Sequence, residues 1–260
     1  MGDANARWKV AWITGASSGI GRELATLLDG RADAVAVSAR SSGKLEELAR
    51  ASPSLKPFPL DVTDERAVAE CVAAIERDCG PIDLAVLNAG TWAIMDTAKM
   101  DLAAMRKGIE VNYIGVVNAL AALVPRMRER GRGHIAIVAS VAGYRGLPRA
   151  GAYGPTKAAL INLAETLRSE LEPFGITVSL VNPGFVDTPM TRGNPFPMPA
   201  IMPVGAAARA LLAGLEKRQY EIIFPRGFVY ALKLLRIVPN RLFFWYVSTF
   251  VVGNRKRKRP

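Results

Sequence analysis

A regular alternation of short apolar segments with helical patterns runs along residues 9–190. The apolar segments are KVAWIT, DAVAVSA, LKPFPL, IDLAVLN, HIAIVAS and ITVSLVN. Helical patterns lie between them, near residues 19–29, 42–51, 64–78, 101–130 and 152–173. Apolar strands separated by helices are typical of a parallel sheet covered by helices on both faces. Because crossovers between parallel strands are right-handed, the sequence predicts a three-layer, doubly wound α/β fold.

The charge distribution divides the chain into a body and a tail. No linker, repeat or low-complexity segment interrupts the first 190 residues, so we expect one domain over residues 1–225. The net charge of the 260-residue chain is +11. Residues 226–260 carry nine Lys and Arg and no Asp or Glu, which leaves 25 basic and 23 acidic residues in the body. The basic charge is therefore concentrated in the tail.

Glycines gather where the first predicted strand meets the first predicted helix, in the segment TGASSGIG. Glycines permit a tight turn and a close approach of the backbone to a pyrophosphate. The helix N-terminus adds free N–H groups and a favourable dipole. The segment therefore predicts a dinucleotide-binding turn rather than a plain glycine-rich turn. Its candidate residues are Gly15, Ser17, Ser18, Gly19, Ile20 and Gly21.

The end of the second strand, VAVSARSS, bears on the choice between NAD and NADP. NAD sites usually place an acidic residue there, where it bonds the ribose hydroxyls. Here Ala39 stands near that position, Arg40 follows it, and Ser41 offers an additional donor. A charge-assisted hydrogen bond from a guanidinium to a 2′-phosphate contributes about 1.5–3 kcal/mol. The sequence predicts a preference for NADP(H) over NAD(H); the alternative is that Arg40 is a solvated residue at a strand end.

Tyr153 and Lys157 are four residues apart near the start of a predicted helix, so their side chains share one face. The ordinary tyrosine pKa, about 10, is too high for efficient proton transfer at neutral pH. A neighbouring ammonium favours the phenolate, so we expect Lys157 to lower the pKa of Tyr153. Taken alone, such a pair is more often a packing contact on a helix face than a catalytic pair.

The ordered set of motifs resembles the short-chain dehydrogenase/reductase family over residues 8–225. The glycine turn resembles that family's TGxxxGIG pattern, and LNAG at 87–90 resembles its NNAG motif, with Leu87 in place of the first Asn. An Asn in IEVNYIG, a Ser after the fifth strand, YGPTK as YxxxK, and VNPGFVDT at 181–188 complete the match. The resemblance implies a Rossmann-like, single-domain oxidoreductase.

The same resemblance implies roles for four residues. Tyr153 would be the general acid in reduction and the base in oxidation. Lys157 would also bond the nicotinamide ribose, and Ser140 would hold the substrate carbonyl oxygen. Asn112 would position a water in a proton relay behind Lys157.

Further cofactor contacts are implied by the resemblance after the third, fourth and sixth strands. We expect Asp61 and Val62 near the adenine. The segment DVTDE is also an expected helix N-cap region, and Asp61 can bind while Thr63 caps. The residues expected along the remainder of the cofactor are Asn88, Ala89, Gly90, Pro183, Gly184, Val186 and Thr188.

In the family, the segment after the PG motif forms a mobile lid over the substrate. Here residues 189–203, PMTRGNPFPMPAIMP, are rich in Pro, Met and Phe and poor in charge. Because ligand pockets are lined mainly by hydrophobic side chains, the segment predicts an apolar or lipid-like ketone or secondary alcohol as substrate. The alternative is an ordinary loop that packs on the core. The apolar residues are Met190, Phe196, Met198, Ile201 and Met202.

The tail combines an apolar segment with basic residues. Residues 242–254 contain no charge, and these thirteen residues are too few for a membrane span of about 20. Trp245, Tyr246 and the nearby Lys and Arg suit the interface of an anionic membrane, and Pro239 is expected to separate two helical pieces. We expect peripheral membrane attachment, with a subunit interface as the alternative. Aromatic and basic residues are segregated, which argues against nucleic-acid binding.

Two other function classes compete with a reductase. A non-catalytic NADP-binding sensor or scaffold on a membrane has no need of the acid in the Asn, Ser, Tyr and Lys set. Sugar-nucleotide epimerases and dehydratases share YxxxK but usually carry a larger C-terminal substrate domain.

Other residues receive simpler interpretations. No His, Cys and Asp cluster has metal-ligand spacing, so no metal is expected. His134, the single histidine, begins a strand and is expected to pack rather than react. Cys71 and Cys79 lie eight residues apart on one predicted helix, too far for a disulfide, which fits a reducing, cytoplasmic compartment. The resemblance also implies a homodimer or homotetramer formed through 101–130 and 152–173.

Overall fold

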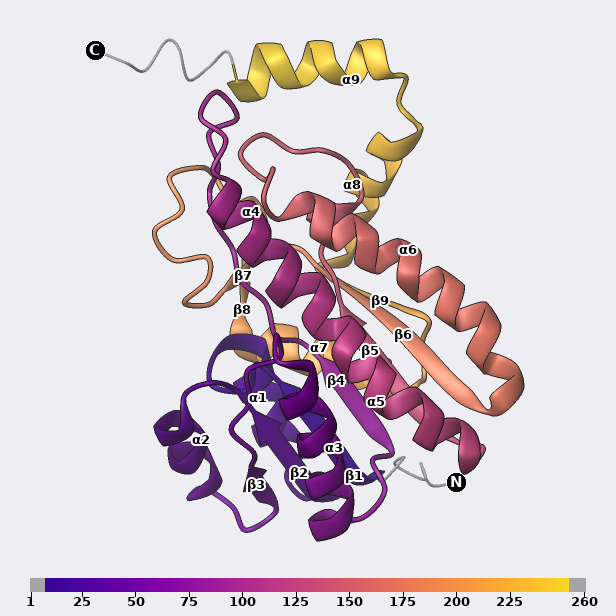
Figure 1. Ribbon diagram of the computed structural model, residues 1–260. Coiled ribbons are helices and arrows are strands. Elements are labelled where there is room, and N and C mark those ends of the chain that lie inside the picture. The colour runs from indigo at the N-terminus through magenta and orange to yellow at the C-terminus, as the bar shows by residue number, and fades with distance from the viewer. Residues whose placement is uncertain (1–7, 253–260) are drawn as a thin grey trace.

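The computed structural model describes residues 8–252, and its centre is a sheet of seven parallel strands (Figure 1). The predicted doubly wound fold and its six strands are confirmed. The short run YEIIFP adds a seventh strand, which pairs with the edge of the sheet from Leu180↔Glu221 to Pro183↔Phe224. In spatial order the strands are β3 (Leu55–Pro57), β2 (Ala32–Ser38), β1 (Trp8–Thr14), β4 (Leu84–Leu87), β5 (Gly133–Val138), β6 (Ile176–Pro183) and β9 (Glu221–Phe224).

Helices cover both faces of the sheet and bury a separate apolar cluster on each (Figure 1). One face carries α3 (Glu65–Cys79), α4 (Leu102–Ile109), α5 (Gly115–Glu129) and α6 (Gly154–Leu171). The other carries α1 (Gly19–Leu28), α2 (Ser42–Ala49) and α7 (Val204–Glu216). Strands such as β4 are buried at every position, which explains why they read as continuous apolar runs.

The strand order predicts a ligand site at the carboxyl ends of the central strands β1 and β4. From β1 the chain winds outward to β2 and β3, then returns to β4 on the other side of β1. In open parallel sheets, ligands bind outside the carboxyl ends of the strands at such a reversal. The ends of β1 and β4 carry the glycine turn and the LNAG segment.

The helix expected near residues 101–130 is present, but a wider helical turn divides it into two parts. α4 passes through a π-helical turn at Glu110–Ile114 directly into α5. By length and composition Leu102–Glu129 is long and apolar enough to cross a membrane, with a mean hydropathy of 1.4 in its most apolar window. Buried side chains such as Val116 and Leu123 pack it against the sheet, so this is weak evidence for a span.

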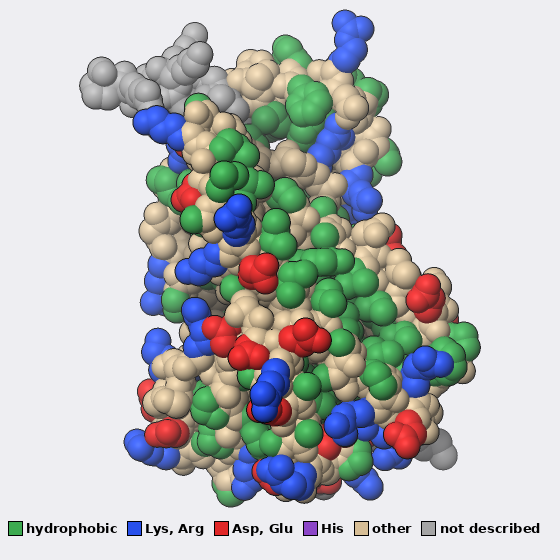
Figure 2. Space-filling model, viewed as in Figure 1, with side chains coloured by type: hydrophobic (Ala, Val, Ile, Leu, Met, Phe, Trp, Pro, Cys, Tyr) green, Lys and Arg blue, Asp and Glu red, His purple; other side chains and the backbone are tan. Residues whose placement is uncertain are grey.

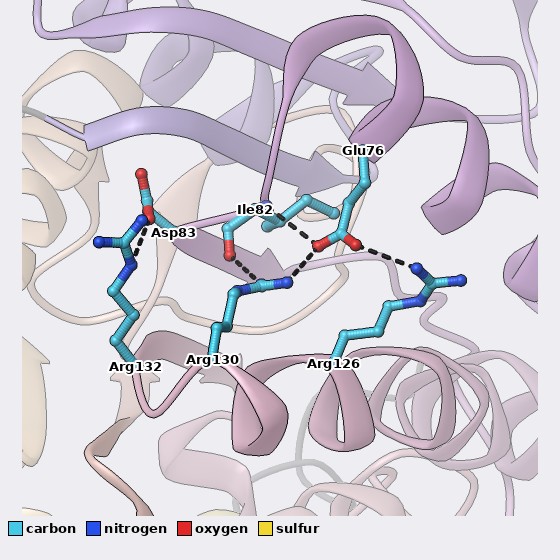
Figure 3. A network of polar contacts seen from close by, with 6 residues as sticks. All are labelled: Glu76, Ile82, Asp83, Arg126, Arg130 and Arg132. Atoms are coloured by element: carbon cyan, nitrogen blue, oxygen red, sulfur yellow. Dashed lines mark hydrogen bonds and ion pairs between the residues drawn. The ribbon is translucent and has the colours of Figure 1, made fainter.

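A polar network fixes α3 against α5 (Figure 3). The Glu76 carboxylate accepts hydrogen bonds from Arg126, at 3.1 Å, and from Arg130, at 2.7 Å. Arg130 also donates to the backbone carbonyl of Ile82, at 2.7 Å. Since Ile82 lies just before β4, the network joins both helices to the start of that strand.

His134 lies in β5 and packs inside the sheet, as expected. Its side chain is 1% exposed, and its Nε2 lies 2.9 Å from the Ser179 hydroxyl. That hydroxyl donates to the carbonyl of Gln219, so His134 must carry the proton on Nε2. Burial, with a smaller contribution from the positive charge of Arg218, lowers the pKa of His134 to about 4.

The histidine should make the stability of the protein depend on pH. An unfolded histidine binds a proton below about pH 6.5, whereas folded His134 does not until about pH 4. Stability is therefore fully present above pH 6.5 and falls as the pH decreases toward 4. We expect His134→Gln to lose about 2 kcal/mol less unfolding free energy than the wild type between about pH 7.5 and about pH 5. Urea titrations of both proteins at each pH measure this, and equal losses would contradict it.

The chain ends in two helices at one end of the molecule, of which the first packs its buried Val229 against the core (Figure 1). α8 (Arg226–Ile237) and α9 (Asn240–Tyr246) are separated near Pro239, and α9 continues into a π-helical turn at Val247–Val252. α9 crosses one end of the molecule, the same end that carries the loop before α4 (Figure 1).

Candidate active site

The glycine turn between β1 and α1 is closely packed. Gly15 and Gly19 have φ angles of +70° and +57°, which disfavour a side chain. A Cβ on Gly15 would lie 2.8 Å from the Cα of Ala89. Gly21 allows the helix to approach the turn, because a Cβ there would lie 2.6 Å from the Gly15 carbonyl oxygen. The turn therefore brings backbone, rather than side chains, to the cleft.

The N-terminus of α1 suits an anion. Ser18 is the N-cap residue, and within the described chain no side chain caps the helix and no acid lies in its first turn. The first N–H groups of α1 and the positive end of its dipole are therefore available for a phosphate. This is the arrangement that a dinucleotide pyrophosphate requires.

Thr14 and Asn88 tie the end of β1 to the segment after β4. The Thr14 hydroxyl accepts hydrogen bonds from the backbone N–H groups of Asn88, at 2.9 Å, and Ala89, at 3.0 Å. The Asn88 amide donates to the Thr14 carbonyl at 3.0 Å. Thr14 therefore positions the segment after β4, a role that was not predicted from the sequence. Its position directly before the glycine turn is the sequence feature that could have indicated this role.

The predicted proton-transfer residues meet at the inner end of the cleft. Ser140 follows β5 and caps a 3-10 turn at Val141–Gly143, with its Oγ accepting from Ala142 N at 3.1 Å. Tyr153 stands at the N-cap of α6 and is hydrogen-bonded to Ser140. The Lys157 Nζ lies 5.5 Å from the Tyr153 ring centroid and donates to the carbonyl of Val138 at 2.8 Å. The structure thus brings Ser140, Tyr153 and Lys157 together.

The expected effect of Lys157 on Tyr153 is wrong in this arrangement. Burial raises the pKa of Tyr153 to about 12, and the hydrogen bond with Ser140 offsets only part of that rise. Burial also lowers the pKa of Lys157 to about 7, so its amine is only partly charged at neutral pH. Desolvation therefore outweighs the attraction that the sequence suggested. Tyr153 is a protonated phenol at neutral pH.

Asn112 lies in the π-helical turn below the cleft and is fully buried. Its side chain accepts from Thr91 N at 2.7 Å and donates to the Thr91 carbonyl and to the Thr156 hydroxyl, both at 3.1 Å. Thr156 in turn donates to the Tyr153 carbonyl at 2.7 Å. Asn112 thus holds the first turn of α6, where Tyr153 lies; the predicted water relay stays a prediction.

Most of the predicted site residues line one cleft of about 400 Å³. Asn112 and Gly21 are the predicted residues outside its lining, and both support it from below. Lys107, Thr91 and Thr191 line it without having been predicted. The predicted residues along the cleft are Gly15, Ser17, Ser18, Gly19, Ile20, Arg40, Ser41, Asp61, Val62, Asn88, Ala89, Gly90, Ser140, Tyr153, Lys157, Pro183, Gly184, Val186 and Thr188.

Arg40, Ser41 and Asp61 lie at the far end of the cleft. Arg40 and Ser41 are exposed, with Ser41 at the N-cap of α2, where its hydroxyl makes no capping bond within the described structure. Asp61 accepts from the backbone and hydroxyl of Thr63, which, with a smaller contribution from Arg40, hold its pKa below the usual value. The cap of α3 is Asp64, which accepts from Ala67 N, and not Thr63 as expected.

An aromatic row leads from Tyr153 to the C-terminal helices. Trp92 meets Tyr153 edge to face at 5.1 Å and Phe196 at 6.3 Å. Phe185 continues the row, 6.3 Å from Phe196 and 5.9 Å from Phe228 on α8. Phe196 belongs to the predicted lid, a loop closed at its base by the short strands β7 (Val186–Asp187) and β8 (Met202–Pro203).

The lid is fastened to the site by polar contacts as well. Trp92 Nε1 donates to Asn194 at 3.0 Å, and Thr191 donates to the Val186 carbonyl at 2.6 Å.

Across residues 8–252 no group of three or more His, Cys, Asp or Glu side chains is placed to hold a metal ion.

Comparisons with known sequences agree with this geometry. A family model described as short chain dehydrogenase matches residues 9–195. An uncharacterized oxidoreductase of Myxococcus xanthus is 35% identical over 244 residues, which cover 92% of this chain and 96% of the relative. An uncharacterized oxidoreductase of Staphylococcus aureus is 32% identical over 217 residues, 82% of this chain and 94% of the relative.

Solved structures resemble the chain along nearly its whole length. A short-chain dehydrogenase from Streptomyces avermitilis has a TM-score of 0.78 and 28% identity, with 95% of this chain and 99% of that one covered. One from Burkholderia cenocepacia, in complex with NADP, has a TM-score of 0.78 and 27% identity, with coverages of 98% and 100%. One from Burkholderia phymatum, in complex with NAD, shares the fold with a TM-score of 0.80 at 24% identity, with coverages of 88% and 93%. The chain is therefore a member of the short-chain dehydrogenase family of oxidoreductases.

Proposed function

We propose that the protein is an NADP(H)-dependent oxidoreductase that transfers a hydride between the nicotinamide and a ketone or secondary alcohol. The observation that carries this proposal is a single cleft with Ser140, Tyr153 and Lys157 at its inner end and Arg40 at its far end. When bound, the nicotinamide supplies or accepts the hydride. The residues of the chain supply the proton and the positioning.

Tyr153 is the proton donor in this proposal. With a pKa of about 12 its phenol is protonated at neutral pH and ready to donate to a carbonyl oxygen. The Ser140 oxygen accepts from Ala142 N, and its hydroxyl, which is hydrogen-bonded to Tyr153 in this structure, can turn to donate to the same carbonyl oxygen. Two donors aimed at one oxygen stabilise the negative charge that develops there during reduction.

Lys157 and Asn112 support this acid from below. A Cβ placed on Gly90 would lie 3.3 Å from the Asn112 Oδ1 and 3.8 Å from the Lys157 Nζ, so both polar atoms approach the same glycine. We assign Lys157 to the ribose hydroxyls of the cofactor and Asn112 to holding the turn that carries Tyr153.

The preference for NADP(H) rests on the composition of the far end of the cleft. Arg40 is exposed there with Ser41 beside it, and Ala39 occupies the place where an acidic residue would repel a 2′-phosphate. A guanidinium and a hydroxyl at the end of β2 match a phosphate better than two ribose hydroxyls.

An apolar substrate fits the aromatic row. A ketone that presents its oxygen to Tyr153 would extend along Trp92 and Phe196, which meet at 6.3 Å. Apolar walls with few polar groups favour a bulky or lipid-like body on the ketone.

A panel of ketones tests the proposed function. We expect NADPH oxidation, followed by absorbance, with bulky or long-chain apolar ketones and much less with small polar ones. Loss of NADPH signal without ketone is the background to subtract. If the protein binds NADPH but turns over no ketone or alcohol in the panel, the non-catalytic sensor becomes the better explanation.

The assembly expected through α4, α5 and α6 stays a prediction. Sedimentation velocity of the full chain without lipid should give the mass of a dimer or tetramer. A monomer at micromolar concentration would contradict it.

A further inference from the structure

The second C-terminal helix presents an unusual surface of large apolar side chains. We define the tail surface as Leu242, Phe244, Trp245, Tyr246 and Phe250, which are 58%, 61%, 60%, 49% and 48% exposed. Three of its rings cluster, with Phe250 5.7 Å from Trp245 and 5.3 Å from Tyr246. Contiguous exposed apolar patches of this kind mark interaction sites in soluble proteins.

The inner side of the tail is fixed to the body, so the tail surface is presented by a docked element. The Arg145 guanidinium lies 3.8 Å from the Phe243 ring centroid and donates to the Val238 carbonyl at 2.8 Å and the Asn240 side chain at 2.6 Å. Phe243 is 2% exposed, in contrast to its neighbours. The apolar residues of α9 therefore divide into one that anchors the helix and several that face outward.

A second anchor holds α8. The Glu221 carboxylate on β9 accepts hydrogen bonds from Lys233 on α8 and from Tyr144 on the body, the latter at 2.7 Å. Burial raises the pKa of Glu221, but these bonds outweigh burial and hold it below its usual value. The carboxylate is therefore ionised at neutral pH and pairs with the Lys233 ammonium.

Charge selects the partner for the tail surface. Residues 226–260 contain nine basic residues and no acidic one. Apolar and basic side chains lie along the end of the molecule that α9 covers (Figure 2). A symmetric pairing through the tail surface would bring the exposed Arg236 and Arg241 of both copies to one interface, because both copies contribute the same patch. An anionic surface attracts them instead.

We propose that the tail surface binds the interface of an anionic lipid membrane, with α9 lying in the plane of that interface. Trp and Tyr prefer this depth, because their rings are amphipathic. Arg241 precedes the apolar residues and is exposed, so it can reach lipid phosphates. The aromatic row that starts at Tyr153 ends at Phe228 on α8, the helix directly before α9.

Cosedimentation of the full chain with vesicles tests this inference. We expect binding to vesicles of phosphatidylglycerol and phosphatidylcholine, much weaker binding to phosphatidylcholine alone, and release by high salt. The double variant Trp245→Ser with Phe250→Ser should reduce the partition onto anionic vesicles by about tenfold or more. The double variant, the control variant described next and the wild type are assayed at the same protein concentration.

A matched control is Phe174→Ser, which removes a ring that is 40% exposed in the turn after α6, outside the tail surface. It should bind anionic vesicles as the wild type does. NADPH binding by each variant shows that the fold is intact and is independent of vesicle binding. Failure of the wild type to bind anionic vesicles would overturn the proposal, as would undiminished binding by the double variant. A change in sedimenting mass of the double variant, without vesicle binding by the wild type, would assign the surface to a second copy.

Discussion

Replacing Tyr153 with phenylalanine is expected to lower kcat by about a thousandfold, within the range of about 10²–10⁴ for loss of a general acid. The change removes only the hydroxyl, so the ring can keep its edge-to-face contact with Trp92 at 5.1 Å. Because the backbone of α6 and the Lys157 bond to Val138 do not depend on that hydroxyl, the Kd for NADPH should change by less than about threefold. Steady-state turnover with the best ketone of the panel and fluorescence titration with NADPH measure the two quantities.

The matched control for Tyr153→Phe is Tyr230→Phe, which removes the hydroxyl of an exposed tyrosine on α8. It should leave kcat and the Kd for NADPH unchanged. Wild-type turnover by Tyr153→Phe would remove the phenol from the proposed mechanism. A parallel loss of NADPH binding would assign Tyr153 to cofactor binding instead of proton transfer.

Replacing Arg40 with alanine is expected to lower kcat/KM for NADPH by about 10- to 150-fold and to leave kcat/KM for NADH nearly unchanged. The guanidinium would pair with a 2′-phosphate, which NADH lacks, so the loss falls on one cofactor alone. Arg40 is exposed and lies at the N-terminal side of α2, so its removal should not disturb the fold. Initial rates with each cofactor at a fixed ketone concentration give the ratio.

Arg50→Ala is the matched control for charge. Arg50 is an exposed arginine at the other end of the same helix, where it forms the C-cap of α2. The Arg50→Ala variant should keep the wild-type kcat/KM for both NADPH and NADH. Equal losses with both cofactors in Arg40→Ala would mean that Arg40 supports the cleft structurally. A wild type that prefers NADH would contradict the NADP assignment itself.

Local signals predicted the elements that depend on local chemistry. Strands such as β1 and β5 are buried on both faces, so their apolar runs were legible without tertiary information. The glycine turn was equally legible, because positive φ at Gly15 and Gly19 needs a residue without a side chain. The strand β9 was not among the six predicted strands, because four residues paired with one edge of a sheet leave little pattern.

Residues that position the cleft were harder to predict from the sequence than the residues that line it. Each of the hydroxyls of Thr14 and Thr156 makes two hydrogen bonds, at least one of them to a residue far away in sequence, and a threonine alone carries no such information. The π-helical turn that buries Asn112 likewise has no sequence pattern of its own. Asp64, rather than Thr63, caps α3, because only the folded backbone decides which oxygen reaches the free N–H.

The sequence by itself determined the fold class, the family resemblance and the order of the motifs that line the cleft, because strand burial, glycine conformation and helical spacing are properties of short segments. The tertiary structure decided the protonation of the site. Burial raises the pKa of Tyr153 and lowers that of Lys157, whereas their spacing alone suggested a lowered tyrosine pKa. It also decided that Phe243 anchors the tail while Trp245 faces outward. Desolvation and docking depend on which distant segments surround a side chain, and a local pattern does not contain that information.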